Sequence, residues 1–337
     1  MTPYGDRVPA APRPVIVDTD GGIDDAVALW WALTDPGLEV LAVTTVWGNV
    51  GVEVATEAVQ RVLHAAGRDD VPVAVGRARP FGPAPDLKPA TFIHGRDGLG
   101  ETTRPAAQPR PVDEPAVALL HRVFSERPGE VSLVTLGPLT NVAQLVTAAP
   151  QVARHVRELV VMGGSFHGFG NALPAAEANI AHDPTAAAAV LAATWAEPPL
   201  LVGLDVTHRA TFTSDEWALL AEQRNDAAAF LGDPLRFYGR FGGSFTTPDC
   251  PCHDLVAVLA LADPGLVTDA AVLPVAVCCE PGPAWGATVA DHRAPHFARD
   301  AGAEQDRPDG FADCRVALDV DVARFRHLFR RLFGGSE

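Results

Sequence analysis

The chain has very little lysine and no long apolar run. Lys88 is the only lysine among 26 basic residues, and the formal net charge of the 337 residues is −16. Proteins that bind nucleic acids need a basic surface to neutralise phosphates, so we expect no nucleic-acid partner. The acidic charge also disfavours binding to anionic membrane surfaces. Because no run of about 18 apolar residues occurs, we expect no membrane span.

Cysteine is scarce as well. Five cysteines, of which Cys278 and Cys279 are adjacent, form a poor disulfide framework. The proline-rich N-terminus has no apolar core of the kind that a signal peptide needs. These features favour a reducing, cytoplasmic location. We predict a mobile tail over residues 1–13 and one domain over residues 14–337.

Short apolar runs alternate with helical patterns along most of the sequence. The runs of Val, Leu and Ile are nearly continuous, which indicates strands buried on both faces of a parallel sheet. The sequence therefore predicts a doubly wound α/β domain, with a mostly parallel central sheet flanked by helices. We expect strands over 14–19, 38–46, 71–75, 130–136, 157–162, 199–205 and 272–279. We expect helices over 23–34, 51–66, 114–126, 139–148, 184–195, 214–223, 226–238, 254–262 and 320–333.

Two segments interrupt this alternation. Residues 76–112 are rich in proline and glycine and include HGRDGLG at 94–100, and residues 239–253 include GGS at 242–244. Long loops inside a compact domain are usually functional or disordered. We interpret both segments as mobile loops over the carboxyl edge of the sheet.

The most informative stretch is VIVDTDGGIDDA at residues 15–26, in which an apolar run leads through four acids into an apolar helix. Carboxylates this close raise one another's pKa unless a cation lies among them, and no lysine or arginine falls between Pro14 and Leu33. Oxygen ligands without sulfur favour Ca²⁺ or Mg²⁺ over zinc. Helix capping would explain one of these acids, but not all of them. The acids are Asp18, Asp20, Asp24 and Asp25.

Polar or glycine-rich turns follow three further predicted strands. They are WGN at residues 47–49, LGPLTN at 136–141 and MGGS at 162–165. Ligands of open α/β sheets bind outside the carboxyl ends of the strands. We therefore predict that these turns and the acids form one site.

A polar cluster further along the chain suits recognition of sugar hydroxyls. It consists of Asn171, Glu177 and Asn179, whose amide and carboxylate groups can pair with hydroxyls. Helix capping is the alternative explanation, because a helix is predicted to begin just after Asp183.

His253 and Asp254 open another predicted helix. The histidine can donate a proton near neutral pH, and the aspartate can join a cation site. Zinc bound by His253 with Cys250 and Cys252 is the alternative. It is disfavoured, because no second pair of Cys or His completes a tetrahedral set.

In this order, the motifs resemble the nucleoside hydrolase family, the inosine-uridine-preferring N-ribohydrolases. The resemblance extends from about residue 14 to residue 261 and includes DTDGGIDD at 18–25 and GPLTN at 137–141. It implies calcium-dependent hydrolysis of the N-glycosidic bond of a ribonucleoside to free base and ribose. It also implies a homodimer or homotetramer.

The resemblance assigns a role to each candidate residue. Asp24 matches the group that takes a proton from the calcium-bound water, and His253 matches the acid that protonates the departing base. Met162 lines the sugar pocket, and His94 lies in the loop near the departing base. The calcium ligands are the side chains of Asp20, Asp25 and Asp254 and the main-chain carbonyl of Leu136. The ribose hydroxyls are bound by Asn49, Asn171, Glu177 and Asn179.

Three positions depart from the family pattern. Gly21 stands where many members have proline, and Ala178 stands where several have phenylalanine beside the ribose. The tyrosine that contacts the base has no certain counterpart: Tyr238 is nearby, but strict alignment gives Gly242. The preferred base therefore stays open at this point.

Other interpretations compete with hydrolysis of nucleosides. A phosphatase of the haloacid dehalogenase type shares only the Asp18-Thr19-Asp20 motif, and Lys88 is poorly placed for its phosphate-binding role. A protein that binds a nucleoside or ribose without catalysis could have the same fold. A modified N-riboside is a further possible substrate.

Overall fold

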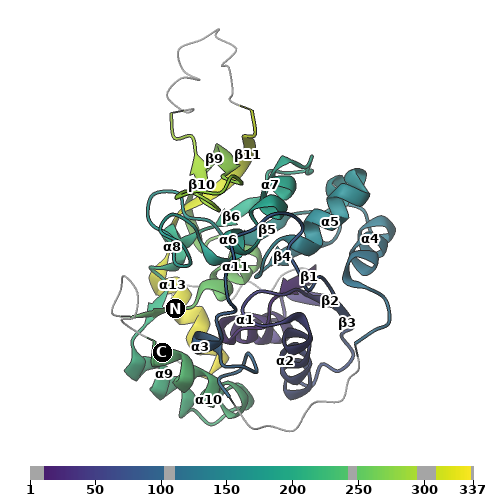
Figure 1. Cartoon of the computed structure of the whole chain (residues 1–337). Coiled ribbons are helices and arrows are strands. Elements are labelled where there is room, and N and C mark those ends of the chain that lie inside the picture. The colour runs from purple at the N-terminus through teal and green to yellow at the C-terminus, as the bar shows by residue number, and fades with distance from the viewer. Residues whose placement is uncertain (1–10, 102–110, 242–248, 294–308, 335–337) are drawn as a thin grey trace.

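A nine-stranded sheet runs through the computed structural model, which describes residues 11–101, 111–241, 249–293 and 309–334 (Figure 1). Its strands are β1 (Arg13–Thr19), β2 (Leu38–Thr45), β3 (Val73–Val75), β4 (Ser132–Thr135), β5 (Leu159–Met162), β6 (Leu200–Val202), β9 (Val267–Val277), β10 (Thr288–Ala290) and β11 (Ala312–Val320). Their order across the sheet is β10-β9-β11-β6-β5-β4-β1-β2-β3. All neighbours are parallel except β9, which is antiparallel to both β10 and β11.

Strand β1 lies where the winding of the sheet reverses. It pairs with β2 on one side and with β4 on the other, both in parallel. The chain therefore continues to one edge through β2 and β3 and to the other through β4, β5 and β6. At such a reversal the loops after the two central strands diverge and leave a crevice at the carboxyl edge.

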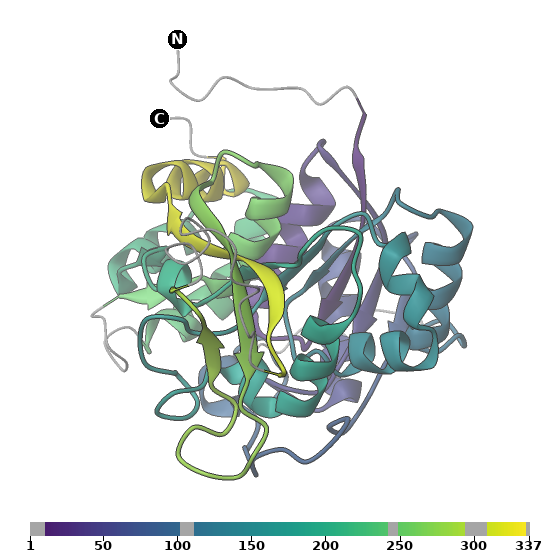
Figure 2. The same ribbon diagram turned by 90° about the horizontal axis from the view of Figure 1, so that it is seen from above.

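Helices cover both faces of the sheet (Figure 2). One buried core packs the sheet against α1 (Ile23–Thr34), α2 (Val52–Ala65), α10 (Asp226–Gly239), α11 (His253–Ala262) and α13 (Val322–Leu332). A second core packs the other face against α4 (Ala116–Glu126), α5 (Thr140–Ala148) and α7 (Pro184–Ala192). Every residue of α1 from Ile23 to Leu33 is buried, so this helix positions its first-turn acids rigidly.

The predicted α/β architecture is confirmed, and most predicted elements are present within a few residues. The predicted helix 214–223 is present as α9 (Ser214–Ala221). The structure adds β10 and β11, a 3₁₀ helix at Pro150–His155, and a small sheet of β7 (Thr211–Phe212) and β8 (Cys250–Pro251). The predicted strand 199–205 is too long, because β6 ends at Val202 and α8 (Leu204–Thr207) follows Gly203.

The predicted tail and loops are described only in part. Strand β1 already begins at Arg13, and residues 1–10 lie outside the described residues. Residues 102–110 and 242–248 also lie outside them. Within residues 76–101 the chain forms one short helix, α3 (Thr91–His94). None of the helices in the described part of the chain is long and apolar enough to cross a membrane.

Candidate active site

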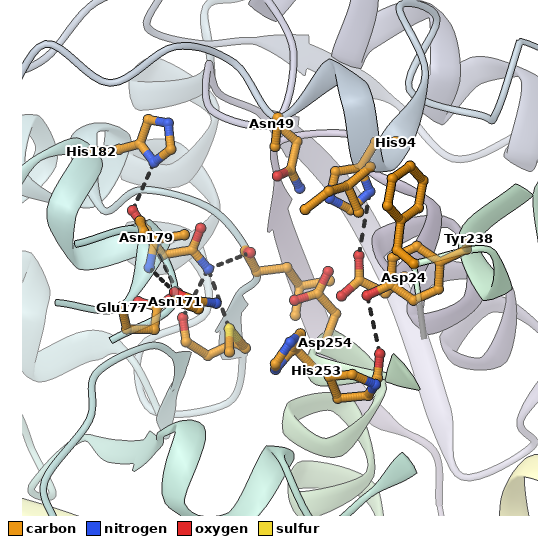
Figure 3. Close-up of a pocket in the computed structure, with 18 of the residues that line it drawn as sticks. Asp24, Asn49, His94, Asn171, Glu177, Asn179, His182, Tyr238, His253 and Asp254 are labelled. Carbon is orange, nitrogen blue, oxygen red and sulfur yellow. Dashed lines mark hydrogen bonds and ion pairs between the residues drawn. The ribbon is translucent and has the colours of Figure 1, made fainter. Parts of the chain in front are cut away.

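A cavity of about 250 Å³ opens at the carboxyl edge of the sheet, and its wall contains nearly all the side chains that the sequence singled out. Figure 3 shows three groups around it: Asn171, Asn179 and Glu177 on one side, Asp24 with His94 and Tyr238 on the other, and His253 with Asp254 between them. The predicted residues on its wall are Asp24, Asn49, His94, Leu136, Met162, Asn171, Glu177, Asn179, His253 and Asp254.

Three buried carboxylates meet beside this cavity. Asp24 and Asp25 come from the first turn of α1, and Asp254 comes from the first turn of α11. One oxygen of each lies within 4.8 Å of the others. Among the residues that the structure describes, this is the one group of His, Cys, Asp and Glu that could hold a metal ion, so the zinc alternative at Cys250 and Cys252 gains no support.

Asn49 ties a fourth carboxylate, that of Asp20, to this group. The main-chain N–H of Asn49 donates to Asp20 Oδ2 at 2.8 Å. Its side-chain amide donates to Asp20 Oδ1 at 3.0 Å and to Asp25 Oδ2 at 3.2 Å. Asp25 also accepts from the N–H of Gly22 at 2.8 Å and from the hydroxyl of Thr19, so the helix-capping contact falls on Asp25.

The electrostatics of the group fit a hard cation. Burial, followed by repulsion from neighbouring aspartates, raises the pKa of Asp20 and Asp254 well above the usual range and that of Asp24 to about 7. Asp24 Oδ1 is buried and has no hydrogen-bond partner among the described residues. A divalent cation would supply the missing positive charge, and carboxylate and carbonyl oxygens are the ligands that Ca²⁺ prefers.

Gly21 lets the chain turn between these acids. Its φ of +76° lies in the left-handed region, and an added Cβ would lie 2.5 Å from Ala55 Cα. Proline is restricted to a φ near −65°, so it could not occupy this position in the present turn. The turn thus differs from the proline-containing one that the family pattern suggested.

Asp18 stays outside the cavity wall. It accepts from the side-chain amide of Asn141 at 2.7 Å and from the hydroxyl of Thr44. Burial raises its pKa to about 7. These contacts join β1 to β2 and to the start of α5, which indicates a structural role.

The opposite side of the cavity presents amides and a carboxylate held by the backbone. Glu177 accepts from the main-chain N–H groups of Asn179 at 2.8 Å, Ile180 at 3.0 Å and Gly164 at 3.2 Å. It caps α6 (Ala178–His182), so the capping interpretation holds for this residue. Burial nevertheless raises its pKa to about 7. Asn171 Oδ1 accepts from the N–H of Ala178 at 2.9 Å, and this hydrogen bond orients the Asn171 side chain.

Asn179 connects this side of the cavity to two strand ends. Its side-chain amide donates to the carbonyl of Leu136 at 2.8 Å and to that of Met162 at 3.1 Å. These residues lie at the carboxyl ends of the adjacent strands β4 and β5. The side chain of Asn179 therefore joins the turns that begin at Leu136 and at Met162, which the sequence placed after different strands.

His253 stands at the start of α11, beside Asp254. Its Nδ1 lies 2.8 Å from the hydroxyl oxygen of Thr207. Burial, and then the nearby imidazoles of His208 and His94, lower the pKa of His253 to about 3. The imidazole is therefore neutral at neutral pH, which suits a hydrogen-bond donor to a ligand, as a neutral histidine can be in an active site.

His94 closes the cavity near Asp24. Its Nδ1 accepts from the N–H of Ile23 at 3.1 Å, so the neutral ring carries its proton on Nε2. Burial lowers the pKa of His94 to about 4. The ring lies 5.7 Å from that of Tyr238, whose hydroxyl donates to the carbonyl of Pro251 at 3.0 Å. Tyr238 therefore belongs to the site, which the sequence left open.

Several residues on the cavity wall were not predicted. His208 directly follows α8. Because the predicted strand 199–205 extended past Val202, the search for polar residues after strand ends did not reach His208. His182 lies one helical turn after Asn179, a spacing that places both on one face of α6. No sequence pattern indicated that Phe92 and Phe241 belong to the cavity wall. They are far apart in the chain and meet only in the fold, with ring centroids 6.0 Å apart.

Comparison with known proteins matches most of the chain to one family. The family model described as "Inosine-uridine preferring nucleoside hydrolase" matches residues 15–327. The inosine-uridine preferring nucleoside hydrolase of Leishmania major is 37% identical over 318 residues, which cover 93% of this chain and 95% of that protein. The probable uridine nucleosidase 2 of Arabidopsis thaliana is 37% identical over 265 residues, which cover 78% and 80%.

A solved structure agrees over a larger share of the fold. A plant nucleoside hydrolase superposes with a TM-score of 0.87 at 34% identity, covering 96% of this chain and all of the plant chain (100%). Such agreement extends to the arrangement of the whole sheet and its helices. The chain belongs to the inosine-uridine preferring nucleoside hydrolase family, whose members hydrolyse the N-glycosidic bond of ribonucleosides.

Proposed function

We propose that this chain hydrolyses ribonucleosides in a Ca²⁺-dependent reaction, with the carboxylate group at the start of α1 and α11 as its centre. The observation that carries the proposal is the meeting of Asp24, Asp25 and Asp254 within 4.8 Å, buried beside a cavity of nucleoside size. No lysine or arginine of the described residues lines that cavity except Lys88, which is exposed. A cation is thus the natural partner of these charges.

Four residues would hold the cation. They are the carboxylates of Asp20, Asp25 and Asp254 and the carbonyl oxygen of Leu136. Bound Ca²⁺ would orient the ribose hydroxyls and the attacking water and make that water more acidic. Asn49 donates to both Asp20 and Asp25, which keeps their oxygens aimed at a common point.

Asp24 would take the proton of the attacking water, and His253 would donate a hydrogen bond to the departing base. Water adds its hydroxyl to the anomeric carbon, and its remaining proton passes to Asp24. The electron pair of the broken carbon–nitrogen bond goes to the base, which accepts a hydrogen bond from the neutral imidazole of His253 and takes its proton from solvent. Asp24 then releases the proton that it took from water to solvent and returns to its initial state. Carboxylates around the sugar also stabilise the cationic character of the transition state.

Two different parts of the cavity wall would bind the ribose and the base. Asn49, Asn171, Glu177 and Asn179 are polar and suit the ribose hydroxyls. Phe92 and Phe241, beside Tyr238 and His94, offer flat apolar surface for the base. Met162 is the last residue of β5, and the side-chain amide of Asn179 donates to its carbonyl at 3.1 Å and lies 3.3 Å from its sulfur.

Two further expectations remain proposals. All five cysteines are free thiols, which supports a reducing compartment such as the cytoplasm. A homodimer or homotetramer is expected from the family resemblance. Light scattering of the purified protein would measure its mass in solution and test the oligomer directly.

Ribose release from inosine, adenosine, guanosine, uridine and cytidine tests the function. We expect release from at least one nucleoside with Ca²⁺ and loss of release after chelation. Restoration by added Ca²⁺, but not by Zn²⁺, would identify the ion. Tight nucleoside binding without release would instead support a binding protein of the same fold. Neither release nor binding would direct the search to a modified N-riboside.

A further inference from the structure

Thr207 touches His253 although 46 residues separate them in the chain. The threonine is the last residue of α8, the short helix that follows the carboxyl end of β6, and it is fully buried. His253 begins α11 and lines the cavity. The hydroxyl oxygen of Thr207 lies 2.8 Å from Nδ1 of His253, which is a normal hydrogen-bond distance.

The direction of this hydrogen bond follows from the partners available to each atom. Among the described residues, His253 Nδ1 is the one atom that pairs with the Thr207 hydroxyl. The carbonyl of Gly203 already accepts from the N–H groups of Val206 and Thr207. A buried hydroxyl proton without an acceptor costs about 1–3 kcal/mol. The arrangement that avoids this cost has Thr207 donating to Nδ1.

The position of the ring proton is then fixed. An imidazole nitrogen that accepts a hydrogen bond carries no proton, so the proton of His253 resides on Nε2. The opposite tautomer would present a lone pair from Nε2, and a lone pair repels the electron pair that develops on a departing base. Only the Nε2–H form can donate to that base.

We propose that Thr207 is a positioning residue that holds His253 as the Nε2–H tautomer, with its N–H available to the departing base. The inference rests on the role proposed above for His253, and it adds a residue that acts through that histidine rather than on the substrate. His208, the next residue after Thr207, packs its ring 5.6 Å from that of His253.

Leaving-group dependence distinguishes this role from a structural one. Thr207→Val keeps the shape of the side chain and removes the donor, whereas Thr207→Ser keeps the donor. With the nucleoside that the wild type hydrolyses fastest, we expect Thr207→Val to lose about tenfold in kcat/KM. With p-nitrophenyl riboside, whose leaving group needs no proton, we expect less than a twofold change. Thr207→Ser should behave as the wild type with both substrates.

Two controls separate the possible failures. Thr211→Val removes another buried hydroxyl, which contacts Asp249 rather than a cavity residue, and should leave both rates unchanged. His253→Ala should reduce hydrolysis of the nucleoside far more than that of p-nitrophenyl riboside. Equal losses in His253→Ala would overturn the role of His253 itself. A selective loss in His253→Ala with none in Thr207→Val would overturn the positioning role alone.

A direct measurement of the tautomer tests the inference even if nucleosides are not hydrolysed. Long-range ¹H–¹⁵N spectra of protein labelled at histidine distinguish a ring protonated at Nδ1 from one protonated at Nε2. We expect the Nε2–H pattern for His253 in the wild type and in Thr207→Ser, and a mixed pattern in Thr207→Val. An Nδ1–H pattern in the wild type would contradict the inference.

Discussion

Asn49 donates two hydrogen bonds to Asp20, one from its main-chain N–H to Oδ2 at 2.8 Å and one from its side-chain amide to Oδ1 at 3.0 Å. The same amide reaches Asp25 Oδ2 at 3.2 Å. Asn49 therefore satisfies two carboxylates that would otherwise repel each other at close range. In the proposed cation site, Asn49 and the cation would together hold these two carboxylates in place.

Asn49→Ala tests this relationship. The variant keeps the main-chain bond and removes the amide, so both carboxylates lose a donor in a buried setting. We expect the free energy of unfolding to fall by about 1–3 kcal/mol in chelator and by clearly less in saturating Ca²⁺. Thermal unfolding in both conditions measures the difference. The same loss with and without Ca²⁺ would show that the amide acts independently of the cation site.

Asp24→Asn is expected to leave the fold intact and reduce kcat by about 10²–10⁴-fold. The amide has nearly the same shape as the carboxylate but cannot take a proton from water. Removal of a repelling charge should leave the melting temperature equal to that of the wild type or higher, since repulsion from Asp25 contributes to the raised pKa of Asp24. Steady-state kinetics and thermal unfolding test both statements. Activity within a few-fold of the wild type would rule out Asp24 as the base.

Ca²⁺ should stabilise the protein more at pH 8 than at pH 5. The pKa of Asp24 is raised to about 7, and those of Asp20 and Asp254 are raised as well, so protons compete with the cation at low pH. A ligand that binds only the folded state raises its stability according to its concentration relative to Kd. Titration of Ca²⁺ at the two pH values, followed by thermal unfolding, measures the shift. An equal or larger shift at pH 5 would contradict the site.

Glu177→Gln should flatten the pH dependence of stability between pH 5 and pH 8. Burial raises the pKa of Glu177 from 4.5 to about 7 in the folded protein. The folded state thus holds this proton more tightly than the unfolded state, and its stabilising effect is present below pH 4.5 and lost as the pH rises through 7. The full effect is on the order of 3 kcal/mol.

Denaturant unfolding in saturating Ca²⁺ isolates this effect, because the cation keeps the aspartate group ionised throughout. The quantity to compare is the slope of stability against pH, since the substitution also changes the contacts with three N–H groups. Identical slopes in the wild type and Glu177→Gln would mean that Glu177 stays ionised in the folded protein.

The sequence predicted the strands and helices in which local pattern and burial agree. Strand β1 and helix α1 are nearly all apolar apart from their acids, and both appear where they were expected. Strands β10 and β11 were missed because they lack such a run: Val289 is exposed, and β11 alternates buried residues with exposed ones such as Arg315. These strands depend on pairing with β9, which no local pattern reveals.

The site was predicted where residues follow parallel strands directly, because the sheet itself brings those residues together. Asp24, Asn49 and Leu136 are of this kind, and all line the cavity. Thr207 was missed for a different reason. Its contact with His253 spans 46 residues and depends on how α8 packs beside α11, so neither segment alone contains the information.

The carboxylates and the aromatic residues of the cavity wall come from different parts of the fold. Their sequences can therefore diverge at different rates. The carboxylates belong to the first turns of α1 and α11, which are locked into the core. The aromatic wall comes from α3 and the end of α10, short or peripheral segments with exposed members such as Phe92. Under the proposed function, substitutions in the aromatic wall would alter the choice of base and leave the carboxylates unchanged. Evolution, or a protein engineer, can therefore retune specificity without rebuilding the reaction centre.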